Sequence, residues 1–393
     1  MNVNQVLPLL AGLTPAQFMR RHWQKKPLLV RQAIPGFKAL LSRAELFALA
    51  AREDVESRLI TRGKAGWHMK KGPFPQRMRS SGKQPWTLLV QGVDLHEQKA
   101  HALLQKFRFV PDARLDDLMI SLASPGGGVG PHFDSYDVFL LQASGSRRWQ
   151  ISKQKDLTLQ PDAPLKILQN FDFEEEYVLE AGDMLYLPPR YAHDGVAVAP
   201  AGAAGKGADC MTYSIGFRAP AREEIAGELL HRLAEFSEDA ADDDASQARS
   251  LYRDPLQVAT DTPARLPSAL IDFAAASVAQ ALRDPLAVAC ALGEYMTAVK
   301  PQVWFDDPAD ELVLPGEGVI LDARTRLMYD DSHIFVNGES YRAKGADARL
   351  MQRLANQRSL SSRELARASA GAIDLLGDWH AAGWLHRAVE ELF

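Results

Sequence analysis

Short runs of alternating apolar and polar residues dominate the chain between about residue 86 and residue 217. The runs are rich in β-branched and aromatic residues and are separated by Gly, Pro and Ser, which is typical of strands joined by turns. They comprise WTLLVQGV, DDLMISLAS, YDVFLLQAS, RRWQIS, EEYVLEAG, DMLYLPP and MTYSIGF. Several strands at this spacing, with few helices between them, predict a β-sandwich or a closed barrel-like unit.

Two short helices are predicted before this β-rich region. In the first, TPAQFMRRHW, Thr14 is expected to cap the helix and Pro15 to occupy its first position. In the second, SRAELFALAA, Ser42 and Glu45 have the spacing of a capping box. Helical elements are therefore expected to precede the strands.

The helical period takes over after Pro220, in AREEIAGELLHRLAEF and PSALIDFAAASVAQAL. Two candidate strands follow Pro301, with Asn337-Gly338 as a strong hairpin signal, and further helical segments end the chain. This last order of elements is typical of a winged helix. We predict an α+β protein with three parts: residues 1–219, a helical region at 220–300 and a small module at 301–393.

Composition sets the class of protein. The chain has 393 residues, of which 46% are hydrophobic and 24% charged, as in ordinary globular proteins. Two cysteines, Cys210 and Cys290, exclude a disulfide framework and a Cys-rich zinc module. The first residues lack the features of a signal peptide, and no apolar stretch reaches membrane-spanning length. We therefore expect a cytoplasmic protein without a membrane partner.

Charge is distributed unevenly along the chain. The net charge of −5 argues against nucleic-acid binding by the whole protein. No acidic residue lies between Glu56 and Asp94, however, and the basic residues of this basic segment are Arg58, Arg62, Lys64, Lys70, Lys71, Arg77, Arg79 and Lys83. Two interpretations stay open: a solvated loop region beside strands, or a basic rim that meets an anionic partner.

Metal-ligating residues are concentrated in two segments. In SPGGGVGPHFDSYDVFLLQ, His132 and Asp134 are two residues apart, so on a strand their side chains would share a face. His-x-Asp alone is a weak signal, but EAGDMLYLPPRYAHDG places His193 after a strand and a Pro-rich loop. Two imidazoles and one carboxylate form the facial set that holds non-haem Fe(II) and leaves positions open.

A cation that would anchor a co-substrate is predicted on a neighbouring strand. In GSRRWQIS, Arg147, Trp149 and Ile151 share one face, and its apolar members indicate that this face points inward. If the co-substrate that reduces dioxygen is 2-oxoglutarate, the guanidinium of Arg147 suits its distal carboxylate. The alternative is that Arg147 and Arg148 both face solvent.

These motifs together resemble the cupin-superfamily, Jumonji-C-type 2-oxoglutarate oxygenases, and among them the bacterial ribosomal oxygenases, which hydroxylate arginine in ribosomal proteins. The resemblance rests on HFD, GSRRW and GDMLYLPPRYAH, and extends to RHWQKKPLLVR, DDLMIS and YSIGFRAP. It implies a double-stranded β-helix (cupin or jelly-roll) core, a helical dimerisation region that makes a homodimer, and a winged-helix-like end.

The resemblance also implies roles for single residues. His132, Asp134 and His193 would be the iron ligands, with 2-oxoglutarate held by Arg147 and O2 as the other co-substrate. The substrate would be an arginine of ribosomal protein sixteen of the large subunit, hydroxylated at its β carbon. The residues expected in the substrate pocket are Asp117, Met119, Tyr136, Tyr213 and Ser214. One departure is Arg190, which stands where cupin patterns often have glycine.

Three alternatives remain open from the sequence. The same oxygenase chemistry could act on another protein side chain, by hydroxylation or demethylation. The chain could instead be a nucleic-acid-binding regulator with a structural barrel, because arginines outnumber acidic residues between residues 342 and 367. A metal-binding cupin without catalytic activity is the third.

Overall fold

The computed structural model describes residues 2–64, 66–75, 84–199, 210–243, 252–255, 264–308 and 312–388. Three members of the basic segment, Arg77, Arg79 and Lys83, lie outside these ranges. The chain forms two compact units, residues 1–219 and 220–393, and each is considered by itself. The boundary expected at residue 300, inside the second unit, stays a prediction.

The first unit is built on an eight-stranded sheet. In spatial order its strands are β1 (Leu28–Val30), β9 (Met184–Leu187), β6 (Val138–Ser144), β11 (Cys210–Phe217), β5 (Leu115–Ala123), β4 (Trp86–Val90), β2 (Ser57–Gly63) and β3 (Gly66–Lys71). All pairs are antiparallel. Every residue of β11 is buried, which is consistent with its central place between β6 and β5.

A second sheet of three strands belongs to the same unit: β10 (Ala192–Val198), β7 (Ser146–Ser152) and β8 (Glu175–Leu179), paired in that order. Apolar side chains of both sheets, among them Val138, Leu140, Trp149, Ile151 and Leu185, pack in one cluster. Two antiparallel sheets packed over shared apolar residues form the predicted cupin core.

Short helices precede and interrupt the strands of this unit. They are η1 (Pro8–Leu10), α1 (Pro15–Arg21), α2 (Arg43–Leu49), η2 (Val93–Leu95), α3 (Gln98–Leu104) and η3 (Gln105–Phe107). Both predicted caps are confirmed, because Thr14 and Ser42 each complete a capping box, with Gln17 and Glu45. The side chain of Phe18 in α1 is fully buried and contacts Phe139 and Tyr186 of the large sheet.

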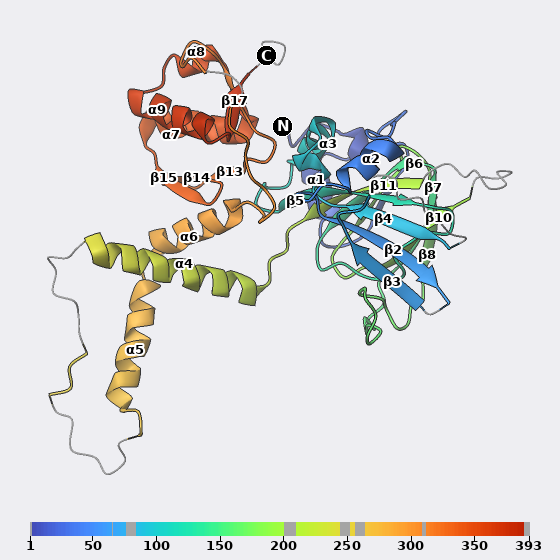
Figure 1. Cartoon of the computed structure of the whole chain (residues 1–393), viewed down its shortest axis with the longest axis horizontal. Helices are drawn as coiled ribbons and strands as arrows, with labels where there is room; N and C mark the ends of the chain where they lie inside the picture. The colour runs from blue at the N-terminus through green and yellow to red at the C-terminus, as the bar shows by residue number, and fades with distance from the viewer. Residues whose placement is uncertain are drawn as a thin grey trace. The chain divides into compact units, whose positions relative to one another are not determined.

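The sequence interpretation missed two features of this unit. The basic segment was open to a loop interpretation, but residues 57–63 and 66–71 form the hairpin β2–β3 at the edge of the large sheet, where Figure 1 shows β2 beside β4 and β3 beyond β2. His193 was placed at the end of a loop, whereas it lies on strand β10, paired with Ile151 of β7. In the hairpin β2–β3, basic side chains on one face obscured the alternation of apolar and polar residues. Before β10, Pro188 and Pro189 obscured the start of the strand.

Three helices begin the second unit: α4 (Arg222–Asp243), α5 (Ser268–Ala281) and α6 (Pro285–Thr297). Helix α6 packs against α4 and against the strands that follow it. On α5, Ile271 and Val278 are apolar and more than half exposed. None of the helices in the described part of the chain is long and apolar enough to cross a membrane.

The end of the second unit is a small α/β module. Its strands form two three-stranded sheets, one of β16 (Ser359–Leu360), β12 (Val319–Leu321) and β17 (Leu385–Arg387), the other of β13 (Leu327–Tyr329), β14 (His333–Val336) and β15 (Glu339–Arg342). Helices α7 (Gly345–Gln357), α8 (Ser362–Leu365) and α9 (Ala370–Ala381) complete it. The predicted Asn337-Gly338 hairpin is confirmed, with both residues at positive φ.

Candidate active site

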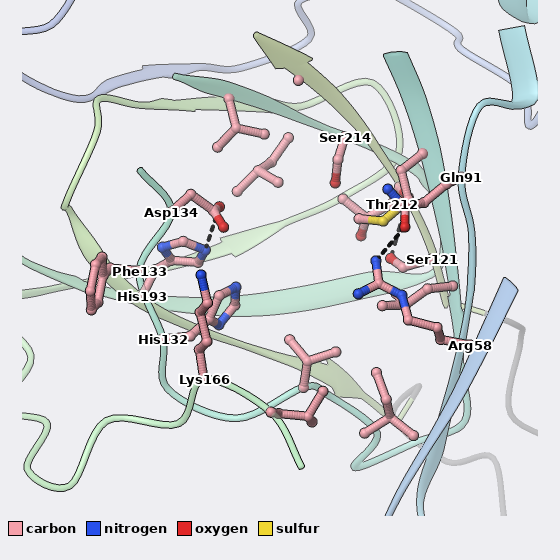
Figure 2. Close-up of a pocket in the computed structure, with 18 of the residues that line it drawn as sticks. Arg58, Gln91, Ser121, His132, Phe133, Asp134, Lys166, His193, Thr212 and Ser214 are labelled. Carbon is pink, nitrogen blue, oxygen red and sulfur yellow. Dashed lines mark hydrogen bonds and ion pairs between the residues drawn. The ribbon is translucent and has the colours of Figure 1, made fainter. Parts of the chain in front are cut away.

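One cavity of about 410 Å³ opens into the cupin core and collects most of the predicted site residues. It is lined by residues of both sheets and of the loops between β5 and β6 and between β7 and β8. Figure 2 shows His132, Asp134 and His193 at one end of the cavity and Arg58, Gln91 and Ser121 at the other. The cavity is therefore polar at both ends, with room for a small molecule between them.

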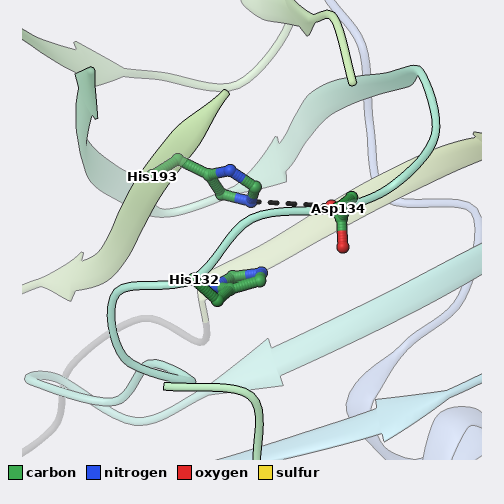
Figure 3. A group of neighbouring side chains, drawn as sticks. All are labelled: His132, Asp134 and His193. Atoms are coloured by element: carbon green, nitrogen blue, oxygen red, sulfur yellow. Dashed lines mark ion pairs between the residues drawn. The ribbon is translucent and has the colours of Figure 1, made fainter. Parts of the chain in front are cut away.

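Three ligand atoms of the predicted metal site lie within 4.8 Å of one another, one each from His132, Asp134 and His193 (Figure 3). The Nε2 atom of His193 is 3.7 Å from Oδ2 of Asp134. The ring centroids of the two histidines are 4.2 Å apart. The structure thus brings together all three residues that the sequence placed in two separate segments.

The local backbone differs from the sequence expectation. His132 and Asp134 lie in the loop before β6 rather than on a regular strand, and the loop forms a single β-bridge, between His132 and His193. The amide of each histidine donates to the carbonyl of the other, at 2.9 and 2.8 Å. This bridge, rather than strand alternation, places the two imidazoles side by side.

Hydrogen bonds orient both imidazoles toward a common point. The Nδ1 atom of His132 lies 2.8 Å from the carbonyl oxygen of Gly130, and Nδ1 of His193 lies 2.9 Å from that of Tyr191. A carbonyl can only accept, so Nδ1 carries the proton in each ring and Nε2 keeps its lone pair. Burial and, after it, the neighbouring His132 lower the pKa of His193 to about 4, although Asp134 opposes the change. His193 is therefore neutral, as a metal ligand must be.

The donor set fits iron. Two neutral imidazole nitrogens and one carboxylate oxygen on one side of a cavity are the ligands of mononuclear non-haem Fe(II) sites. The hydrogen bond on the far nitrogen of each ring supplies the outer support that such ligands need. Residues 132, 134 and 193 line the 410 Å³ cavity and would hold a metal ion there.

The loop before β10 adopts the backbone geometry of a glycine position although Arg190 occupies it. Its φ of 63° lies in the left-handed region, which explains why glycine is frequent at this position in cupins. Its amide donates to the carbonyl oxygen of Asp134 at 2.7 Å, and its guanidinium lies over the ring of Phe133 at 5.8 Å. These two contacts hold the loop before β10 against the metal-ligand loop.

Arg147 lies inside the cavity, on the inner face of β7 that the sequence indicated. It is 3% exposed, and its Nη1 and Nη2 atoms contact the carbonyl of Gly195 at 3.3 Å and Oγ of Ser121 at 3.4 Å. Its Nε atom has no hydrogen-bond partner, and among the described residues Arg147 forms no ion pair. Burying an uncompensated cation is costly, so this guanidinium fits a carboxylate of a bound molecule.

Four of the five residues predicted for the substrate pocket line the same cavity, namely Asp117, Met119, Tyr136 and Ser214. Tyr136 is 38% exposed at the surface of the cavity. The charge of Asp134, followed by burial, raises the pKa of its phenol, so that Tyr136 stays protonated and can donate a hydrogen bond. Oδ2 of Asp117 accepts a hydrogen bond from the amide of Gly92 at 3.0 Å, which fixes its carboxylate.

The fifth residue, Tyr213, was wrongly predicted. It is fully buried in the main apolar core of the unit, where its ring contacts Phe37 and its hydroxyl accepts a hydrogen bond from the amide of Leu40 at 2.8 Å. The reason is the two-residue period of strand β11. Ser214 and Thr212 face the cavity, so Tyr213 between them must face the opposite side.

Sequence reasoning missed several residues of the cavity wall, notably Arg58, Gln91 and Lys166. Nη2 of Arg58 donates to Oε1 of Gln91 at 2.6 Å (Figure 2). Arg58 and Ile60 alternate with Leu59 on β2, a signal that was present but was masked by the surrounding basic residues. Lys166 comes from the long β7–β8 loop, for which the sequence carried no signal.

Two family models and several curated relatives match parts of the chain. A model described as "JmjC domain" matches residues 102–225, and one described as "ROXA-like winged helix" matches residues 280–386. The chain is 41% identical over 212 residues to "Ribosomal protein uL16 3-hydroxylase" of Escherichia coli, covering 53% of this chain and 54% of that protein. It is 36% identical over 212 residues to "Probable ribosomal oxygenase" of Haemophilus influenzae, covering 53% and 50%. The matched stretch thus spans about half the length of these curated relatives.

Solved structures match over almost the whole chain. The X-ray structure of Escherichia coli ycfD superposes with a TM-score of 0.79 and 28% identity, covering 96% of this chain and 98% of that one. A structure of YcfD, described as a ribosomal oxygenase in complex with cobalt and 2-oxoglutarate, superposes with a TM-score of 0.77 and 27% identity, covering 96% and 99%. These matches confirm the fold class and the resemblance inferred from the sequence. Residues 102–225 thus match a JmjC domain and residues 280–386 a ROXA-like winged helix, and the chain shares the fold of the ribosomal oxygenase YcfD of Escherichia coli.

Proposed function

We propose that this protein is an Fe(II)- and 2-oxoglutarate-dependent hydroxylase that modifies an arginine side chain of a ribosomal protein. One observation carries the proposal: the cluster of His132, Asp134 and His193 lines the same cavity as Arg147, whose guanidinium has no carboxylate partner among the described residues. A metal site beside a buried cation without a carboxylate partner suits a metal-chelating dicarboxylate better than a structural ion.

The three ligands would hold iron as neutral imidazoles and an ionised carboxylate. Iron bound with 2-oxoglutarate supplies oxidative decarboxylation, in which dioxygen gives one oxygen atom to succinate and the other to a C–H bond of the substrate. The chain orients the reacting groups: Arg147 would bind the distal carboxylate, with Ser121 and the Gly195 carbonyl setting the direction of its guanidinium. Trp149, whose ring lies 5.7 Å from that of His193, would form an apolar wall on this side of the cavity.

The substrate arginine would enter past Tyr136. Asp117, held by the amide of Gly92, offers a carboxylate acceptor for its guanidinium, and Met119 and Ser214 form the adjacent wall. A charge-assisted hydrogen bond to Asp117 would orient the side chain and present its β carbon to the metal site. This assignment makes the protein a peptidyl-arginine 3-hydroxylase, which agrees with the name of the Escherichia coli relative, a ribosomal protein uL16 3-hydroxylase.

The test is a coupled assay with purified protein, Fe(II), 2-oxoglutarate, oxygen and ribosomal protein uL16. We expect succinate and a product that is heavier by one oxygen atom in equal amounts, with the oxygen located on an arginine. Uncoupled succinate formation without a modified protein would contradict this substrate, while loss of a methyl group would identify a demethylase. A relative from Drosophila persimilis, 25% identical over 201 residues, is described as bifunctional, a lysine-specific demethylase and a histidyl-hydroxylase, so both products are sought.

We also propose that the protein forms a homodimer and acts in the cytoplasm. Ile271 and Val278 are one heptad apart on α5 and more than half exposed, so they form an apolar stripe that suits a second copy of the chain. Replacing both residues by glutamate should shift the mass measured by light scattering from dimer to monomer. An unchanged mass would place the dimer interface elsewhere.

Nucleic-acid binding by the winged helix has less support. Helix α9 carries Asp374 and Asp378 but neither lysine nor arginine, so it lacks the positive charge of a helix that enters the major groove. Arg353 pairs with Glu364, and Arg358 donates to backbone carbonyls, which accounts for two of the arginines counted in the sequence. We therefore propose a protein partner and no sequence-specific DNA target.

A further inference from the structure

A second, smaller cavity of about 210 Å³ lies beside the candidate active site and shares no lining residue with the first cavity, although the carbonyl of its Gly130 orients His132. Its walls are the hairpin β2–β3, the glycine-rich segment before the metal-ligand loop, and the outer face of β10. Arg62, Trp67, Gly128, Asp194 and Val196 are among the residues that line it.

The two cavities share one face of the hairpin β2–β3. Ile60 of β2 and Met69 of β3 are paired and line the active-site cavity, while Arg62 and Trp67, paired two residues further along, line the second cavity. Residues two apart on a strand lie on the same face, about 7 Å from each other. An extended peptide lying along this face would therefore present alternate side chains to the two cavities.

The two cavities adjoin at two backbone segments, where consecutive residues line different cavities. Val129 lines the active-site cavity, and its neighbour Gly128 lines the second cavity. On β10, His193 lines the active-site cavity, and the next residue, Asp194, lines the second cavity. The second cavity is thus distinct from the metal and co-substrate positions but lies directly beside them.

Asp194 gives the second cavity its chemistry. Its Oδ1 atom is buried and has no hydrogen-bond partner among the described residues. Arg62 lines the same cavity with its guanidinium over the ring of Trp67 at 5.1 Å, and it forms no hydrogen bond with this oxygen. A buried acceptor without a donor is costly, so the cavity favours a ligand that brings one. Trp67 adds a flat aromatic wall, which suits an aliphatic or planar stem behind the donor.

We propose that the second cavity is a specificity subsite for the protein substrate. It would accept a side chain that carries a nitrogen donor (lysine, arginine or a carboxamide) and stands two positions from the hydroxylated residue. Asp194 would accept the hydrogen bond, and Trp67 would pack on the stem. The inference rests on the proposed protein hydroxylase function and adds which neighbouring residue of the substrate is selected.

The test measures peptide binding separately from turnover. Fluorescently labelled peptides with a central arginine carry lysine, glutamine or norleucine at position −2 or +2. They are titrated by anisotropy into Mn(II)-loaded protein with 2-oxoglutarate, without oxygen. We expect lysine or glutamine at one of these positions to bind about 10-fold more tightly than norleucine, the gain of a charge-assisted hydrogen bond.

Variants of the subsite give the decisive comparison. Asp194→Asn should reduce the preference for a donor to less than about 2-fold, within the scatter expected between unrelated sites. Val196→Phe, which fills the cavity from β10, should abolish the preference without altering a charge. Asp172→Asn, an exposed change on the loop before β8, is the matched control and should keep the full preference. The manganese content of each variant is measured, because Asp194 adjoins His193.

Two results would overturn the proposal. One is wild-type protein that binds donor and norleucine peptides equally. The other is a preference that survives both Asp194→Asn and Val196→Phe. Failure of the proposed function would be recognised in a separate assay with Fe(II) and oxygen, in which a bound peptide would yield neither succinate nor a hydroxylated product. The binding preference measured by anisotropy does not depend on that assay.

Discussion

The backbones of His132 and His193 are joined by two hydrogen bonds, in which the amide of each residue donates to the carbonyl of the other. The pair links the loop before β6 to strand β10, so two ligands that are far apart in sequence share one bridge. Because the bridge uses only backbone atoms, it does not depend on either side chain. Placement of the ligands is thus separated from their chemistry.

This separation predicts that His132→Ala removes metal binding without unfolding the protein. We expect the affinity for Mn(II) or Co(II) to fall by more than about 100-fold, since losing even an outer supporting partner costs about 10–100-fold. The midpoint of thermal unfolding of the metal-free variant should stay within a few degrees of wild type. Calorimetric titration and circular dichroism measure the two quantities. A variant that still binds metal with wild-type affinity would contradict the ligand assignment.

Arg147→Met should make the protein more stable and unable to bind 2-oxoglutarate. The hydrogen bonds of the buried guanidinium are long, at 3.3 and 3.4 Å, and an apolar side chain can keep its packing on the ring of Trp149, so this change should raise the free energy of unfolding by about 1 kcal/mol. Urea unfolding and equilibrium binding of 2-oxoglutarate to the Mn(II) protein check both effects. Arg148→Met, on the exposed face of the same strand, is the control and should leave the affinity for 2-oxoglutarate unchanged. If Arg147→Met destabilises the protein, the buried cation is a structural feature.

Tyr213 and Ser214 are neighbours on β11 for which opposite effects are expected. Tyr213→Phe leaves the amide of Leu40 without its acceptor and should cost about 1–3 kcal/mol of stability, with no change in the KM for the peptide substrate. Ser214→Ala should raise that KM and leave stability nearly unchanged, because Ser214 lines the cavity. Urea unfolding and steady-state kinetics on both variants separate the core from the pocket. A higher peptide KM for Tyr213→Phe would restore the original pocket prediction.

Local signals carried most of what could be predicted from the sequence. Caps such as Thr14 and Ser42 act within four residues, and the strand runs are bounded by their own turns, so these elements were predicted correctly. The position of Tyr213 required the register of β11, which is set by partners on β5 and β6. That Oδ1 of Asp194 and Nε of Arg147 lack hydrogen-bond partners depends on residues far apart in sequence, so only the structure reveals it.

The turn at Asp183 predicts a pH dependence of stability. Burial opposes ionisation of Asp183, but donors from the amide of Gln32, the guanidinium of Arg31 and the amide of Glu180 hold its pKa below the ordinary value of 3.8. Its contribution to stability is therefore complete above about pH 5 and is lost as the pH falls through the lowered pKa. Asp183→Asn should cost about 1.5–3 kcal/mol at pH 7 and progressively less below pH 4. Urea unfolding at several pH values measures this; a cost that does not vary with pH would show that the charge of Asp183 is irrelevant.

Gly128 connects backbone packing to co-substrate binding. A Cβ atom at Gly128 would lie 2.6 Å from the carbonyl oxygen of Gly195, the oxygen that accepts a hydrogen bond from Arg147. The obstacle is backbone, so Gly128→Ala must displace β10 and should cost about 1–3 kcal/mol of stability. The displaced carbonyl would release Arg147, so the affinity for 2-oxoglutarate should fall as well.

Gly227→Ala is the matched control: Gly227 lies on the exposed surface of α4 with nothing near its Cβ position, so alanine should stabilise the helix by about 1 kcal/mol. Weakened 2-oxoglutarate binding in Gly128→Ala alone would show that the carbonyl of Gly195 positions the anchor. Unchanged 2-oxoglutarate binding despite lower stability would show that Ser121, and not the carbonyl of Gly195, positions Arg147.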